Sequence, residues 1–257
     1  MGTLDIPIRS QKPRADGITL VNDRGIGIRA WQDAIDMAGE YVDIVKLGIG
    51  TAYVMQNLHQ KVSFLQQHDI RVILGGTLFE NFWVQDQLPS YYQFVKDLGL
   101  DCVEISSGSY PIPLADKIAA VSQFANEFCV LAEVGDKDDH RQASNAGQVA
   151  EALALRQAGA TKVIMEGRAS GTGGMYNDAG EPDDTLITAM TDALPIQDII
   201  FEAPLESQQI DFIRRFGANV NLGNVPFEDI LMLETERVGL RFDTQSVTRA
   251  LEPLNDA

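Results

Sequence analysis

The chain has 257 residues, of which 45% are hydrophobic and 22% are charged, and its formal net charge is −17 at pH 7. A chain of this length and composition can bury a full hydrophobic core, as one barrel or as two smaller domains. The negative charge argues against nucleic acids and anionic membrane surfaces as partners. Residues 1–10 hold no apolar run of signal-peptide length, and no later stretch approaches a membrane span.

Eight short apolar segments are predicted strands, and stretches with helical spacing separate them. Their ends lie mostly about 20 to 35 residues apart, the length that a strand, a loop, a helix and a return loop require. No linker rich in serine, glycine or proline divides the chain, so a single domain over residues 1–257 is expected. The predicted strands are 18–22, 42–46, 71–74, 102–105, 130–134, 162–166, 199–202 and 220–222.

The stretches between the strands have the spacing of amphipathic helices. Leu58, Val62 and Leu65, for example, recur at i, i+4 and i+7. Gly99 follows a later helical stretch and precedes a strand, as a residue in the left-handed conformation at a helix end should. Eight such strand–helix units predict a closed (β/α)₈ TIM barrel, with an open doubly wound sheet as the alternative.

Both cysteines, Cys102 and Cys129, lie inside apolar runs. Cysteine is among the most frequently buried residue types, so buried and unreactive thiols are expected. This usage and the lack of a signal-peptide pattern together predict a cytoplasmic location.

Four of the predicted strands carry a glutamate as their last or second-last residue, and a turn follows each. Parallel strands of a barrel end at one mouth, where barrel enzymes build their active sites. Carboxylates gathered there repel one another unless a cation lies among them, most simply a divalent metal with oxygen ligands. The alternative is a set of rim salt bridges that only stabilise the barrel. The four glutamates are Glu104, Glu133, Glu166 and Glu202.

Two glycine-rich loops after strands are predicted to bind an anion, although either could simply be a tight turn. Residues 167–174 combine flexible backbone with a hydroxyl and a guanidinium group. Residues 221–224 leave the last strand, where barrel enzymes often hold a phosphate with backbone N–H groups. The candidate substrate-binding residues are Arg168, Ser170, Gly171, Asn221, Gly223 and Asn224.

Short blocks of sequence, taken in order, resemble the phosphosulfolactate synthase family. The resemblance extends from about residue 12 to 244, nearly the whole chain. It implies a (β/α)₈ barrel and a carbon–sulfur lyase of coenzyme M biosynthesis, which adds sulfite to phosphoenolpyruvate with Mg²⁺ and gives (2R)-phospho-3-sulfolactate. The blocks are 12–14 with Gly17, 45–48 with 50–51, 75–80, 103–106, 133–135 with Lys137, 202–205, 208–209, 220–224 and 239–241.

The chemistry that the resemblance implies fits the predicted mouth. Sulfite attacks the methylene carbon of phosphoenolpyruvate, and bound Mg²⁺ stabilises the charge that develops on the carboxylate. A general acid then protonates the adjacent carbon. Lys137 resembles the family's lysine and is the first choice, with Lys46 as the alternative. The competing interpretation is that Lys137 only neutralises an acidic loop.

Three departures from the family pattern keep other functions open. Ala169 stands where the family has a glutamate, Glu206 where it has a basic residue, and Phe242 where it has a glycine. A barrel enzyme acting on another phosphorylated enol or hydroxy acid is therefore one alternative, and a non-enzymatic, stress-related homologue is another. The sequence leaves the nucleophile, the product stereochemistry and a homo-oligomeric state open, but the retained lysines and glutamates favour an enzyme.

Overall fold

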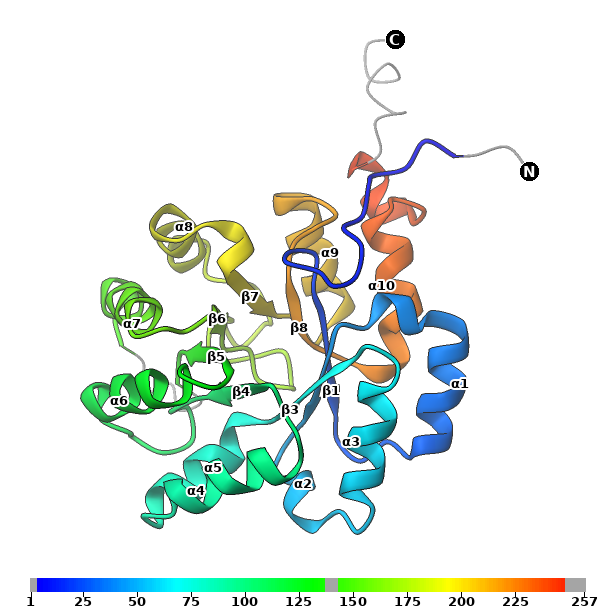
Figure 1. Ribbon diagram of the computed structural model, residues 1–257. Helices are drawn as coiled ribbons and strands as arrows, with labels where there is room; N and C mark the ends of the chain where they lie inside the picture. The colour runs from blue at the N-terminus through cyan, green and yellow to red at the C-terminus, as the bar shows by residue number, and fades with distance from the viewer. Residues whose placement is uncertain (1–3, 137–142, 248–257) are drawn as a thin grey trace.

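Eight parallel strands alternate with helices in the computed structural model, which describes residues 4–136 and 143–247 (Figure 1). The strands are β1 Thr19–Asp23, β2 Ile44–Leu47, β3 Arg71–Leu74, β4 Cys102–Ile105, β5 Cys129–Val134, β6 Lys162–Met165, β7 Ile199–Glu202 and β8 Leu222–Val225. The helices are α1 Ile28–Ala38, α2 Thr51–Val54, α3 Leu58–Gln66, α4 Gly76–Val84, α5 Leu88–Asp97, α6 Leu114–Phe124, α7 Asn145–Gln157, α8 Asp184–Ala193, α9 Glu206–Phe216 and α10 Ile230–Arg237.

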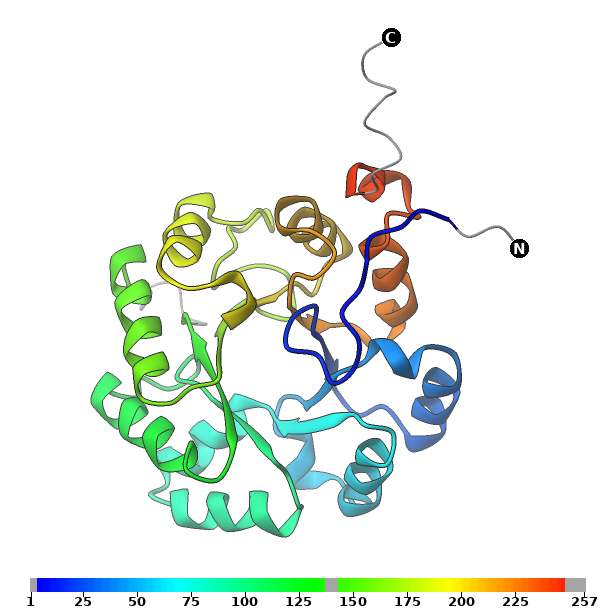
Figure 2. The ribbon, with the colours of Figure 1, turned by 45° about the horizontal axis from the view of Figure 1, so that its top comes forward.

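The strands follow one another around a nearly closed barrel. Their order is β3-β2-β1-β8-β7-β6-β5-β4, so β1 pairs with both β2 and β8. β4 also lies beside β3, which brings the two ends of the sheet together. Figure 2 shows the helices arranged around the outside of the strands. The predicted (β/α)₈ barrel is confirmed, and the open doubly wound sheet is wrong.

The core has two layers because side chains alternate between the two faces of each strand. One set, including Val21, Val45 and Val103, packs outward against the helices. The other set fills the interior of the barrel. Of the two cysteines, Cys102 is fully buried as predicted, whereas Cys129 is only partly buried. The interior set is Ile18, Leu20, Ile44, Ile73, Cys102, Leu131, Ile164 and Ile200.

The same alternation explains how the barrel mouth is built. In each strand, the residue two positions after an inward-facing apolar side chain also points inward, and it lies nearer the carboxyl end of the strand. Seven strands place a polar residue or a glycine there, so a polar layer covers the apolar interior. The pairs are Leu20 and Asn22, Ile44 and Lys46, Ile73 and Gly75, Cys102 and Glu104, Leu131 and Glu133, Ile164 and Glu166, and Ile200 and Glu202.

The segment before β1 packs against α10 on the side of the barrel where both ends of the described chain lie (Figure 1). Arg9 makes an ion pair with Glu234 at 2.9 Å and donates to the carbonyl of Ala218 at 2.9 Å. Among the described residues, no helix combines the length and the apolar character that a membrane crossing requires.

Candidate active site

A cavity of about 350 Å³ opens over the polar layer at the carboxyl ends of the strands. It receives side chains from strands and loops on all sides of the barrel. All four predicted glutamates and Lys46 reach it, as do Arg168 and Asn224. The predicted convergence of these residues on one mouth is therefore what the geometry shows. The other lining residues are Asn22, Gly48, Ile49, Gly75, Gly76, Thr77, Ser109 and Ala169.

Lys46 places a positive charge among the glutamates. Its Nζ lies 2.6 Å from Oε1 of Glu202 and 3.2 Å from Oε2 of Glu104. Backbone N–H groups complete this arrangement, since Gly76 donates to Glu104 at 2.6 Å and Gly167 donates to Glu202 at 2.9 Å. Lys46, Glu104 and Glu202 thus form one buried hydrogen-bonded group.

The protonation of this group follows from burial opposed by charge. Burial lowers the pKa of Lys46, but the surrounding carboxylates outweigh it and hold that pKa above the ordinary lysine value. Burial raises the pKa of Glu104 to about 7, with Lys46 opposing the shift and the neighbouring glutamates adding to it. Burial also raises the pKa of Glu202, against the effect of Lys46. Lys46 is therefore a stable cation, and Glu104 titrates near neutral pH.

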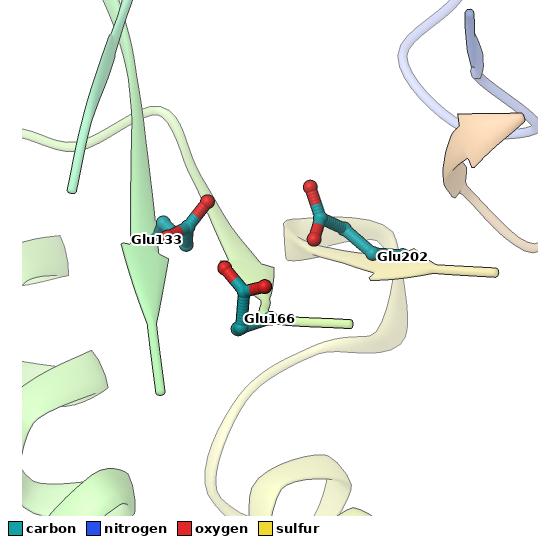
Figure 3. A group of neighbouring side chains, drawn as sticks. All are labelled: Glu133, Glu166 and Glu202. Atoms are coloured by element: carbon teal, nitrogen blue, oxygen red, sulfur yellow. The ribbon is translucent and has the colours of Figure 1, made fainter. Parts of the chain in front are cut away.

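Three of the glutamates form a group that could hold a metal. Glu133, Glu166 and Glu202 are buried, and each offers a carboxylate oxygen within 4.8 Å of the other two. Figure 3 shows the three side chains converging from neighbouring strands. An octahedral Mg²⁺ with oxygen ligands at about 2.1 Å places those oxygens roughly 3 to 4.2 Å apart. At most one pair among three octahedral ligands is trans, so at least two of these separations must be about 3 Å. The donor set therefore fits Mg²⁺ after the oxygen–oxygen separations shrink by up to about 1.8 Å, or with bridging water.

The loop between β6 and α8 carries Arg168 to the cavity wall. Gly173 and Gly174 both have positive φ values, 71° and 63°, which favour glycine. The buried Gln208 of α9 donates to the carbonyls of Gly171 at 2.8 Å and Gly180 at 3.1 Å. The loop is thus held to the neighbouring βα unit.

Other predicted anion-binding residues of this loop lie outside the cavity lining. Gly171 is buried with its N–H donating to the carbonyl of Arg168 at 2.7 Å. Ser170 is exposed, and its hydroxyl lies 3.0 Å from that of Thr172. Lys137, the predicted general acid, lies outside the described residues.

The loop at the last strand differs from its prediction. The strand was expected at 220–222, but β8 is Leu222–Val225, so the strand continues through Gly223. Asn224 therefore lies at the mouth, where its Nδ2 donates to the carbonyl of Gly167 at 3.0 Å. Gly223 lies within the strand, where a side chain would come 3.1 Å from Ile200.

Asn221 is at the opposite end of the barrel, so its predicted place at the mouth is wrong. It precedes β8, and its Nδ2 donates to the carbonyl of Ile199, the first residue of β7, at 2.9 Å. Its Oδ1 accepts from the N–H of Ile18 at 3.1 Å, just before β1. The side chain closes the amino-terminal end of the sheet, because it satisfies backbone groups where the strands begin.

Sequence reasoning missed two contributors to the site. Asn22 faces the cavity in register with Lys46, whereas the next residue, Asp23, makes an ion pair with Lys61 outside the cavity. Glu80 is fully buried and accepts from the backbone N–H groups of Ser109 and Tyr110 at 2.7 and 2.8 Å, which fixes the loop that lines the cavity. The two-residue alternation within the first strand could have identified Asn22.

Two of the departures from the family pattern have distinct surroundings. Ala169 is exposed and lines the cavity, so the site lacks a carboxylate there. Glu206 begins α9 and makes an ion pair with Arg241, which also pairs with Glu236 at 3.0 Å and Asp243 at 3.2 Å. Glu206 is therefore ion-paired, although Arg241 shares its single charge among three carboxylates.

Comparison with known proteins gives a consistent result. The family model described as (2R)-phospho-3-sulfolactate synthase (ComA) matches residues 7–243. A phosphosulfolactate synthase of Bacillus subtilis is 38% identical over 94% of this chain and 97% of its own length. One from Methanothermobacter thermautotrophicus is 40% identical over 93% and 95% of the two chains. Among solved structures, a 3-hexulose-6-phosphate synthase shares the fold with a TM-score of 0.52 at 16% identity, over 90% of this chain and 95% of its own.

Proposed function

The chain belongs to the (2R)-phospho-3-sulfolactate synthase (ComA) family, and from this premise we propose that its barrel mouth adds sulfite to phosphoenolpyruvate with the help of Mg²⁺. The protein is an enzyme of the phosphosulfolactate synthase type, so the non-enzymatic alternative is set aside. Its cytoplasmic location, its role in coenzyme M biosynthesis and a homo-oligomeric state stay predictions.

The observation that carries this proposal is the convergence of Glu133, Glu166 and Glu202 beside the cations of the same cavity. Carboxylate oxygens are the ligands that Mg²⁺ prefers. When bound, Mg²⁺ supplies positive charge to the substrate carboxylate at the stage when negative charge accumulates there. The three glutamates would hold the ion, and Glu104 would remain with Lys46.

The reaction consumes one proton in addition to its two substrates. The sulfur of sulfite forms a bond to the methylene carbon of phosphoenolpyruvate while the carbon–carbon double bond opens. The electron pair moves toward the carboxylate, and the carbon that bears the phosphate then accepts a proton. This proton must come from a group at the mouth, because the new carbon–hydrogen bond forms there.

We propose Lys137 as the donor of that proton. Lys46 is a poor donor in the metal-free protein, since its carboxylate neighbours hold its pKa above the ordinary lysine value. Its ion pairs with Glu104 and Glu202 favour a purely electrostatic role. Lys137 follows β5 by three residues, and β5 carries Glu133 to the same mouth.

The substrate phosphate is proposed to bind beside Arg168 and Asn224. Both residues line the cavity, and Asn224 joins the loop of Arg168 through its bond to Gly167. The planar guanidinium can donate two parallel hydrogen bonds to a phosphate. None of Ser170, Gly171 and Gly223 lines the cavity. Ser170 and Gly171 would act through the shape of the Arg168 loop, and Gly223 through the close packing of β8 against Ile200.

A direct assay tests the proposed reaction. Purified protein, treated to remove metals, is mixed with phosphoenolpyruvate and sulfite, with and without Mg²⁺, and the products are followed by phosphorus NMR. We expect a new phosphate-ester resonance only when sulfite and Mg²⁺ are both present. Conversion without sulfite would identify a different nucleophile, and no conversion with all components would refute the proposed substrate pair.

A further inference from the structure

Gly173 lies directly beneath the guanidinium group of Arg168. A Cβ at this position would lie 2.6 Å from both Cζ and Nε of Arg168, and 2.9 Å from Nη2. Carbon and nitrogen atoms that are not bonded do not approach so closely, so the guanidinium occupies the space of the missing side chain. We propose that Gly173 is a positioning residue, whose missing side chain forms a seat that sets the orientation of Arg168 toward the substrate phosphate. This inference rests on the phosphate role proposed above for Arg168.

The backbone around the seat is tied in place on both sides. Gln208 holds the carbonyls of Gly171 and Gly180. The N–H of Met175 donates to the carbonyl of Glu166 at 2.9 Å. Because these bonds flank Gly173, the loop has little freedom to move away from an added methyl group. The guanidinium, at the end of a flexible side chain, is the part that must yield.

Displacement of the guanidinium matters because its hydrogen bonds are directional. A guanidinium donates to a phosphate through a rigid planar fork, and two parallel bonds form only when the fork faces the oxygens. A displaced fork therefore binds the phosphate more weakly. The seat therefore determines whether Arg168 binds the phosphate with both bonds or with a weaker single contact.

Gly173 could instead be required only for its positive φ of 71°. Gly99 provides a matched control for this explanation. Its φ is 66°, and a Cβ added there would meet no atom within 4 Å. It follows α5 and precedes β4, at the end of the barrel away from the mouth. Gly99→Ala thus introduces comparable backbone strain without touching Arg168.

A double-mutant cycle separates the two explanations. The KM for phosphoenolpyruvate and kcat are measured for the native enzyme, Gly173→Ala, Arg168→Ala, the double variant and Gly99→Ala. We expect Gly173→Ala to raise KM about 5-fold or more with kcat nearly unchanged. In the Arg168→Ala background the same change should add less than about 2-fold, because the two residues act as one unit. Gly99→Ala should leave both constants unchanged.

The other outcomes are equally informative. A raised KM in Arg168→Ala with an unchanged KM in Gly173→Ala would overturn the seat and leave the phosphate role standing. An unchanged KM in Arg168→Ala would overturn both. Equal effects of Gly173→Ala in the two backgrounds would also overturn the seat. If Gly173→Ala does not fold, recovery of folding in the double variant supports the seat, and failure to recover refutes it.

Discussion

Replacing Lys46 by methionine should destabilise the protein far more than the loss of an ordinary ion pair. With an effective dielectric constant of about 20, attraction to Glu202 at 2.6 Å and Glu104 at 3.2 Å amounts to about 6 and 5 kcal/mol. The cost of burying the ions, several kcal/mol for each, offsets much of this. The single change leaves the buried carboxylates without their cation, so a loss of about 3–5 kcal/mol is expected.

The assay is urea unfolding at pH 7.5 in the absence of divalent metal. Lys96→Met is the matched control, because Lys96 lies 2.7 Å from Glu127 in a pair whose side chains are 45% and 48% exposed. That variant should lose little or no stability, because solvent screens an exposed ion pair. Adding Glu202→Gln to Lys46→Met should restore part of the loss, since it removes one of the repelling charges. Equal losses in Lys46→Met and Lys96→Met would refute the reasoning.

Three further predictions concern pH, metal and proton transfer. Glu104→Gln should flatten the pH dependence of stability, measured by urea midpoints between pH 5 and 8.5. Folding raises the pKa of Glu104 from 4.5 to about 7, so the folded state binds the proton of Glu104 more tightly than the unfolded state does. The stability that this proton contributes is complete below about pH 4.5 and is lost as pH rises through 7. Glu166→Gln should weaken Mg²⁺ binding by tenfold or more in calorimetry, because a neutral amide replaces a carboxylate ligand; unchanged binding would move the metal elsewhere. Lys137→Met should lower kcat by roughly 10²- to 10⁴-fold with substrate binding retained, and a change of only a few-fold would assign it the counter-charge role.

Most of the barrel was predictable because its strands carry strong local patterns. Three predicted strands, 71–74, 102–105 and 199–202, coincide with the observed bounds. The last strand was placed too early because Gly223 and Asn224 are typical turn residues. In the barrel, pairing with β1 and β7 carries the strand through them, and Asn224 adopts a φ of 51°. Because the predicted strand began two residues too early, Asn221 was expected at the mouth, whereas it lies at the other end of the barrel.

The charge pattern of the site was less predictable than its location. Strand ends identified the glutamates, since each follows an apolar run in the sequence. The ion pairs of Lys46 with Glu104 and Glu202 could not be predicted, because they join β2 to β4 and β7 across the barrel. The hydrogen bonds from the loop backbone to Glu80 could not be predicted from the sequence either, since they join a helix to a loop about 28 residues later.

Charge at the mouth links metal binding to substrate binding. The four glutamates contribute −4 when ionised, and Lys46 with Arg168 contributes +2, so these six side chains sum to −2. Phosphoenolpyruvate and sulfite are themselves anions, and a chain with a net charge of −17 offers them little long-range attraction. A bound divalent cation brings the same six side chains to neutrality. The proposed metal would therefore act first on affinity, by removing repulsion, and only then on the chemical step, where its charge stabilises the developing carboxylate charge.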